Sequence, residues 1–191
     1  MVAWLGNRNI TPDALCPAVA DKILATRHLS PYLRRQTGLT GLKDVSVIQP
    51  GVLGQTGMEA KEIIEGAVER LHPDAIIIVD ALAAREVARL GRTVQLSNTG
   101  IAPGSGVGNS RTELSEKTLG VKCVTVGVPT VVDASTLCYD LIGENRREHE
   151  SMIVTPRDFD RMIENSGQVI AYSLNIALQP DVDAETLISC V

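Results

Sequence analysis

Two aspartates, Asp13 and Asp80, occupy positions where a carboxyl group can do acid–base chemistry. Asp80 directly follows the apolar run Ala75–Val79, and Asp13 lies soon after the apolar start of the chain, Met1–Leu5. Burial at the end of a strand disfavours the charged form of a carboxyl group and raises its pKa, so that the group can hold a proton. A second carboxylate beside it can take a proton from water, which gives a general acid–base pair.

Each aspartate also has a purely structural interpretation. Asp80 is suited to cap the N-terminus of a helix after its strand, and Asp13 in a first helical turn complements the helix dipole. Taken singly, neither residue identifies a catalytic site. They become a candidate pair because their strands are expected to be neighbours, and sites in parallel sheets lie beyond the carboxyl ends of the strands.

A polar, glycine-rich loop, residues 99–109, is expected at the same edge of the sheet. Glycine lets another backbone approach closely. We therefore expect the main-chain amides of this loop to hold an extended substrate, at Gly104, Ser105, Gly106 and Asn109. A phosphate-binding loop is disfavoured because the segment lacks the GK[ST] ending and does not link a strand directly to a helix.

The cysteines and histidines form no metal-binding or redox pattern. The four cysteines are widely spaced without a CxxC pair, so we expect reduced thiols in a cytosolic compartment, with Cys16 and Cys123 buried. A nucleophilic role for Cys16 would need an adjacent base, and no histidine is near it in the sequence. We predict no metal and no cofactor. The histidines available to a metal are His28, His72 and His149.

Strand-like and helix-like segments alternate along the chain. Two short apolar or β-branched runs are typical of buried parallel strands, and weaker runs accompany them. The expected strands are Ala75–Val79, Cys123–Val126, Val45–Ile48, Thr93–Leu96 and Met1–Leu5.

Apolar residues at helical spacing occupy the intervening segments. The first expected helix has Thr11 as N-cap and Pro12 at its first position, where both residue types are preferred. Strands that alternate with helices predict an α/β fold, in which a mostly parallel β-sheet has helices on both faces. The expected helices are Pro12–Arg27, Met58–Leu71, Asp80–Leu90, Pro156–Ile163 and Gln168–Leu178.

Length and composition fit a single domain, residues 1–191, with the charged stretch 143–150 as a solvated loop. The chain is 44% hydrophobic and 21% charged, which is ordinary for a globular protein. Its net charge of −5 argues against a nucleic-acid partner, which would need a basic face. The longest apolar runs are strand-sized, so no membrane span is expected, and the start of the chain lacks the basic segment of a signal peptide.

Longer motifs around these residues make the chain resemble the bacterial spore germination protease family. The motifs follow the family's order and extend from residue 3 to about residue 180, nearly the whole chain. They are Leu5–Leu15 (LGNRNITPDAL), Thr26–Leu29 (TRHL), Pro50–Gly57 (PGVLGQTG), Asp80–Arg85 (DALAAR), Thr99–Asn109 (TGIAPGSGVGN), Gly127–Ala134 (GVPTVVDA) and Val154–Pro156 (VTP).

The resemblance implies a three-layer α/β sandwich around a mostly parallel sheet, the fold of the hydrogenase-maturation endopeptidases. It implies an endopeptidase that initiates degradation of small acid-soluble spore proteins during germination, in the cytoplasm of the spore core. It also implies an atypical aspartic mechanism, whose two essential aspartates fall by motif on Asp13 and Asp80. We expect no membrane partner and no direct nucleic-acid partner.

The chain departs from the family pattern in several places. Family members usually begin with a further region that includes an activation propeptide, whereas here the first core strand is Met1–Leu5. Cys16 stands where a glycine is expected, the segment between Asp133 and Val154 is short, and Ala171–Asn175 lacks the usual glycine pair. Without the N-terminal region, we expect the first strand to lie near an uncovered edge or face, and the chain to form a homo-oligomer through exposed apolar surface.

Two alternatives to the aspartate pair stay open. In the first, a metal ion lies between Asp13, Asp80 and a histidine, as in the hydrogenase-maturation relatives, where it would polarise the scissile carbonyl and supply hydroxide. In the second, the chain keeps the fold but is a catalytically silent scaffold.

Overall fold

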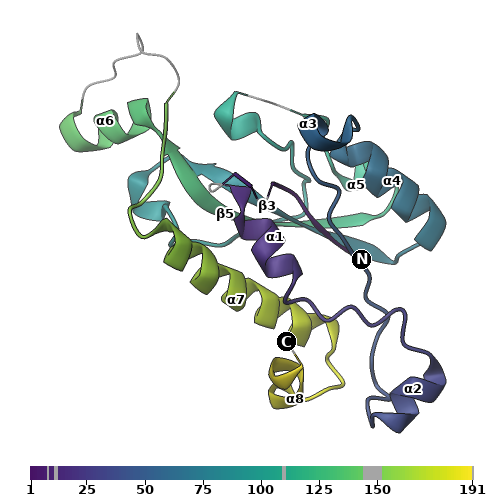
Figure 1. Cartoon of the computed structure of the whole chain (residues 1–191). Helices are drawn as coiled ribbons and strands as arrows, with labels where there is room; N and C mark the ends of the chain where they lie inside the picture. Colours follow the sequence, from purple (N-terminus) through teal and green to yellow (C-terminus); the bar gives the residue numbers. More distant parts are fainter. Residues whose placement is uncertain (8, 11–12, 109–110, 144–151, 191) are drawn as a thin grey trace.

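A six-stranded β-sheet forms the centre of the molecule (Figure 1). This computed structural model describes residues 1–191 except 8, 11–12, 109–110, 144–151 and 191. In the described residues the strand order is β2-β1-β3-β5-β4, and β6 also pairs with β5. The strands are β1 (Val2–Trp4), β2 (Val47–Ile48), β3 (Ala75–Ala84), β4 (Gln95–Ser97), β5 (Lys122–Asp133) and β6 (Ile153–Val154).

The sheet is mostly parallel. Strands β2, β1, β3 and β5 run parallel to one another, while β4 and β6 run antiparallel to β5. Every predicted strand is present with shifted bounds, so the predicted α/β class with a mostly parallel sheet is confirmed. β1 and β3 are direct neighbours, as expected for the strands that deliver Asp13 and Asp80.

β3 is longer than the apolar run that predicted it and continues through Asp80 to Ala84. The predicted helix Asp80–Leu90 is wrong, and only Val87–Arg89 forms a short 3-10 helix. Alanine and leucine favour helices, but Ala81–Ala84 pair with β5, and sheet pairing overrides a weak local preference. Asp80 therefore lies inside a strand, and its interpretation as a helix N-cap is wrong.

Helix α1 (Leu15–Ala20) is much shorter than the predicted Pro12–Arg27. Beyond its end, the Asn175 side chain accepts the N–H of Leu24 at 3.0 Å and donates to the carbonyl of Lys22 at 2.9 Å. These tertiary hydrogen bonds replace the ones that a longer helix would have made. The predicted start of the helix lies outside the described residues, at Thr11 and Pro12.

Two predicted C-terminal helices form one continuous helix, α7 (Phe159–Leu178). Helix α4 (Ala60–Leu71) matches its prediction closely and begins at a capping box between Glu59 and Glu62. Among the described residues, no helix is long and apolar enough to cross a membrane. The sequence patterns missed helices with few turns, which show little periodicity. These are α2 (Pro31–Gln36), α3 (Leu53–Thr56), α5 (Glu116–Leu119), α6 (Ala134–Ile142) and α8 (Ala184–Ser189).

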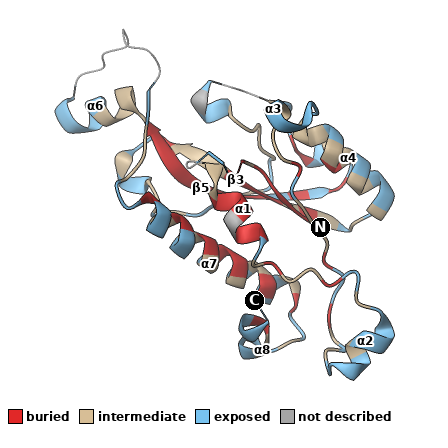
Figure 2. Cartoon of the chain, viewed as in Figure 1, coloured by how far each residue is buried: buried red, intermediate tan, exposed pale blue. Residues whose placement is uncertain are grey.

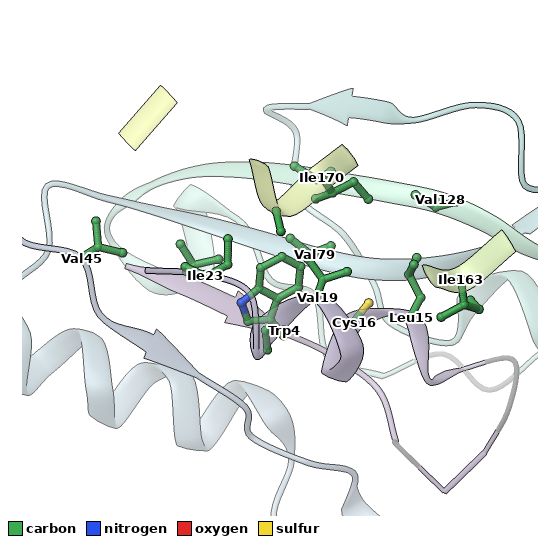
Figure 3. Close-up of a cluster of buried hydrophobic side chains, with 14 of the residues drawn as sticks. Trp4, Leu15, Cys16, Val19, Ile23, Val45, Val79, Val128, Ile163 and Ile170 are labelled. Atoms are coloured by element: carbon green, nitrogen blue, oxygen red, sulfur yellow. The ribbon is translucent and has the colours of Figure 1, made fainter. Parts of the chain in front are cut away.

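Helices cover both faces of the sheet and give three layers, with the buried residues concentrated along the strands and the helix surfaces that contact them (Figure 2). On one face, α1 and α7 bury a cluster that includes Trp4 and Val79 (Figure 3). On the other face, Ile64 of α4 packs in a cluster with Ile78. Neighbouring residues of β3 thus join opposite clusters, as the pleat of a strand requires.

β1 is an interior strand, and its residues Val2–Trp4 are at most 1% exposed. β2 pairs with one of its edges, β3 with the other, and the two apolar clusters cover its faces. The expectation that the first strand lies near an uncovered edge or face is therefore wrong. Its neighbours within the described residues already cover it.

Candidate active site

The candidate site forms where β1 leaves the side of β3. The N–H of Leu5 donates to the carbonyl of Val79 at 2.9 Å, one step beyond the paired residues of the two strands. The chain then turns at Gly6, whose φ of 115° is a conformation that residues with a side chain rarely adopt. β3 continues past this turn through Asp80.

The loop after Gly6 brings Asp13 back beside the turn. The N–H of Asn7 donates to Oδ2 of Asp13 at 3.0 Å, and the N–H of Asp13 donates to the carbonyl of Ile10 at 2.8 Å. A Cβ at Gly6 would lie 2.5 Å from the carbonyl oxygen of Asp13 and 3.2 Å from its Cγ, so only glycine permits this approach. Asp13 precedes α1, and the loop holds its carboxyl group.

A second set of hydrogen bonds, which the sequence patterns did not reveal, fixes the same loop. Asn7 is buried, and its Oδ1 accepts the N–H of Asn9 at 2.9 Å and Nε2 of Gln55 at 3.1 Å. Gln55 belongs to α3, so two segments far apart in the sequence meet at Asn7, whose N–H bonds to Asp13. The available signal was that Asn7 and Gln55 both lie within family-like motifs, although neither residue type indicates this contact.

Asp80 lies in a more buried environment than Asp13. It is 5% exposed, and its Oδ1 accepts the N–H of Ala81 at 3.0 Å. Burial, followed by the negative charge of Asp13, raises the pKa of Asp80 to about 7. Burial also raises the pKa of Asp13, but the hydrogen bond from Asn7 opposes that rise. The two carboxyl groups therefore influence one another and differ in how strongly they hold a proton.

Cys16 packs beneath this pair. It is fully buried in the cluster between the sheet and the layer of α1 and α7 (Figure 3). Burial raises the pKa of its thiol well above the ordinary value, and the charges of Asp80 and Asp13 raise it further. A thiol that stays protonated is a poor nucleophile, in agreement with a packing role for Cys16. Cys123 is also buried, as predicted.

Both carboxyl groups line one cleft of about 590 Å³. Its walls come from β3 at Asp80–Ala83, from the glycine-rich loop and from the beginnings of α3 and α4. The candidate substrate-binding residues Gly104, Ser105 and Gly106 line this cleft, whereas Asn109 lies outside the described residues. The fold thus brings the two sequence-predicted groups of residues to one place, while their roles stay predictions.

Charged side chains line the same cleft. Nη1 of Arg111 lies 3.7 Å from Oε1 of Glu59, which connects the segment after the glycine-rich loop to the beginning of α4. Lys61 forms an ion pair with Glu65 at 2.7 Å, and Arg85 follows the end of β3. These residues were not predicted from the sequence, apart from Arg85, which lies in a family-like motif, because charged surface residues carry no periodic pattern.

Among the described residues, no three side chains of the kinds that bind metals form a cluster. His72 follows the C-terminal end of α4, about 18 Å along a helix of this length from the end that lines the cleft. His28 also does not line the cleft, and His149 lies outside the described residues. The described part of the chain therefore offers no histidine to a metal between the two aspartates.

A family model described as "Germination protease" matches residues 1–144, a span that contains both aspartates and the glycine-rich loop. The chain belongs to the germination protease family. Because this is a peptidase family, membership assigns the chain to the peptide hydrolases.

Curated germination proteases are similar over about three quarters of the chain or more. The protein of Clostridium tetani is 43% identical over 221 aligned residues, which cover 98% of this chain and 68% of the relative. That of Clostridium acetobutylicum is 43% identical, covering 96% and 66%, and that of Oceanobacillus iheyensis is 53% identical over 142 residues, covering 74% and 38%. The chain thus spans about two thirds of the length of the two clostridial relatives.

Among solved structures, the solution structure of the endopeptidase HycI from Escherichia coli is similar to this chain, with 13% sequence identity and a TM-score of 0.43. The match covers 90% of this chain and 88% of HycI. The fold class itself follows from the sheet order and the layers of helices described above.

Proposed function

We propose that this chain is an endopeptidase that cleaves small acid-soluble spore proteins during germination, by an atypical aspartic mechanism. The observation that carries the proposal is the pair Asp13 and Asp80, which line one cleft in unequal environments. Two carboxyl groups whose surroundings separate their pKa values are suited to opposite roles, one as acid and one as base. Membership of the germination protease family supports a protein substrate.

Asp80 is the acid and Asp13 the base in this mechanism. Ionised Asp13 takes a proton from water while the water oxygen bonds to the scissile carbonyl carbon. Protonated Asp80 gives its proton to the carbonyl oxygen, so a neutral tetrahedral diol forms. When the C–N bond breaks, Asp13 returns its proton to the leaving nitrogen and Asp80 takes one from a hydroxyl group of the diol. Both aspartates then have their starting protonation states.

The environments of the two carboxyl groups support this assignment of roles. Asp80 is the more deeply buried group, and the adjacent negative charge also favours its protonated form. Asp13 accepts a backbone N–H, which favours its ionised form, and it is accessible enough to meet water. Because the carboxyl groups interact, they titrate as a pair, and their shared proton resides mainly on Asp80.

A cleavage assay on a purified small acid-soluble spore protein tests the proposal. Asp80→Asn and Asp13→Asn should each lower kcat by at least about 10²-fold, because asparagine keeps the shape of aspartate but cannot move the proton. Asp160→Asn, an exposed aspartate in the first turn of α7, is the matched control and should retain activity. A wild-type chain that does not cut the substrate would favour the catalytically silent scaffold instead.

We also propose that the chain forms a homo-oligomer in the cytoplasm of the spore core. The interior position of β1 gives this no support, but α6 exposes three large apolar side chains that could meet a second copy. Light scattering at two protein concentrations tests it, and Leu141→Glu on α6 should lower the measured mass. The exposed residues are Tyr139, Leu141 and Ile142.

A further inference from the structure

β3 extends beyond its neighbour β1 on one side of the sheet. β1 pairs with residues 77–79 of β3, and β3 runs on from Asp80 to Ala84. On its other side, β3 stays paired with β5 as far as Ala84. Among the described residues, no strand pairs with Asp80–Ala84 on the β1 side. This part of β3 is therefore a sheet edge within the molecule.

The outward backbone groups of this edge belong to Ala81 and Ala83. The N–H of Ile77 and the carbonyl of Val79 bond to the β1 segment, and every second residue of a strand directs its backbone groups to the same side. The N–H of Ala81 donates to the carboxyl group of Asp80. Within the described part of the chain, no backbone hydrogen bond is found on this side for the carbonyl of Ala81 or for either group of Ala83.

The carboxyl groups lie at the start of this edge. Gly6, where β1 turns away, contacts Asp13, and Asp80 bonds to the first outward N–H of the edge. The glycine-rich loop lies close to the other end of the edge. A Cβ placed on Gly106 would lie only 2.8 Å from Cβ of Ala83. The edge from Asp80 to Ala83 is about 10 Å long, and all four of its residues line the cleft.

We propose that the substrate peptide binds along this edge as an added β-strand, in line with β1 and with its scissile bond beside the carboxyl pair. The inference rests on the proposed endopeptidase function and names how that site holds its substrate. An unpaired strand edge is a template for another extended chain.

Strand addition has a signature that side-chain recognition lacks. In either direction, a peptide paired with this edge donates two N–H groups, two residues apart, to the carbonyls of Ala81 and Ala83. The probe is a short synthetic peptide spanning a bond that the chain cuts in a small acid-soluble spore protein. In a series of its variants, each backbone nitrogen outside the scissile bond is methylated in turn.

Methylation at two positions separated by one residue should lower kcat/KM by about 10-fold or more, and methylation of the residue between them should have little effect. A flat profile, or sensitivity at adjacent positions only, would overturn strand addition while cleavage of the parent peptide upheld the proposed function. Failure to cut any small acid-soluble spore protein would overturn both.

A second measurement does not depend on turnover. In the Asp13→Asn chain saturated with the parent peptide, the amide hydrogen of Ala83 should exchange at least about 10-fold more slowly than in the free chain. The amide of Leu82 faces β5 and serves as the internal reference. Equal exchange of Ala83 in the free and bound chains would contradict the proposal.

Discussion

Asp80 and Asp13 share one cleft but are held by two different kinds of structure. Asp80 lies within a ten-residue strand paired along its length with β5, and only 5% of the residue is exposed. Asp13 lies in a loop, where the Asn7 N–H and the absence of a side chain at Gly6 hold it in place. The strand buries one carboxyl group and raises its pKa, while the loop leaves the other accessible to water. In the proposed mechanism, this difference in burial makes Asp80 the acid and Asp13 the base.

Gly6→Ala should disturb the loop that holds Asp13 and leave the strand that holds Asp80 unchanged. The new Cβ would meet the Asp13 carbonyl oxygen at 2.5 Å, and φ is 115°, so the loop must move and displace Asp13. We expect kcat/KM to fall by about 10²-fold, the cost of roughly 1 Å of misplacement. Gly66→Ala in α4, where a Cβ meets nothing within 4 Å, is the matched control and should keep full activity. Near wild-type turnover by the Gly6 variant would mean that the position of Asp13 does not matter.

The pH dependence of kcat/KM tests the role of Asp80, the carboxyl group held by strand β3. Asp80 must be protonated to act as the acid, and its pKa is about 7, so activity should fall as pH rises through 7. Well above that pH the loss should approach about tenfold per pH unit. Initial rates between pH 5 and 9 check this, at saturating and at limiting substrate. A profile that stays level to pH 9 would exclude Asp80 as the acid.

Asp80→Asn should also change how stability depends on pH. The folded chain raises the pKa of Asp80, so between about pH 4 and 7 the folded state holds more protons than the unfolded state. Wild-type stability from this group is therefore lost as pH rises through that window. Relative to wild type, the variant should gain on the order of 2–3 kcal/mol between pH 5 and 8, measured by denaturant unfolding. Asp160→Asn is the control, and an equal gain there would remove the burial argument.

Asn7→Ala should have the smallest effect on activity. It removes the acceptor used by the Asn9 N–H and by Gln55, which loosens the loop without blocking Asp13. We expect kcat/KM to fall by about 10-fold or less, as for the loss of one or two hydrogen bonds, and Gln55→Ala to cost less than Asn7→Ala. The reverse order would show that α3, rather than the loop, positions the carboxyl group.

The sheet and the placement of the two aspartates at one cleft were accessible from the sequence because their signals are local. Uninterrupted apolar residues at Ala75–Val79 indicate a buried strand, and an aspartate directly after such a run is conspicuous. The membership of both aspartates in family-like motifs supplied the rest of the candidate site.

The errors fall where distant residues decide local structure. The end of α1 depends on Asn175, and the extension of β3 beyond Asp80 depends on pairing with β5. Neither partner is visible in a window of neighbouring residues. The contact between Gln55 and Asn7 was missed for the same reason, since side-chain hydrogen bonds between segments leave no periodic pattern.

Because Cys16 is buried, the rate at which its thiol is alkylated measures how often the site opens. Cys138 and Cys190 are exposed and should be alkylated at once by a thiol reagent, whereas Cys16 can react only when α1 lifts from the sheet. Cys123 is also buried, so it is first replaced by alanine. The slow phase of alkylation then reports how often α1 separates from the sheet near the two carboxyl groups. A peptide that binds in the cleft and stabilises it would slow the alkylation of Cys16. Peptide binding could then be measured without cleavage of any peptide bond.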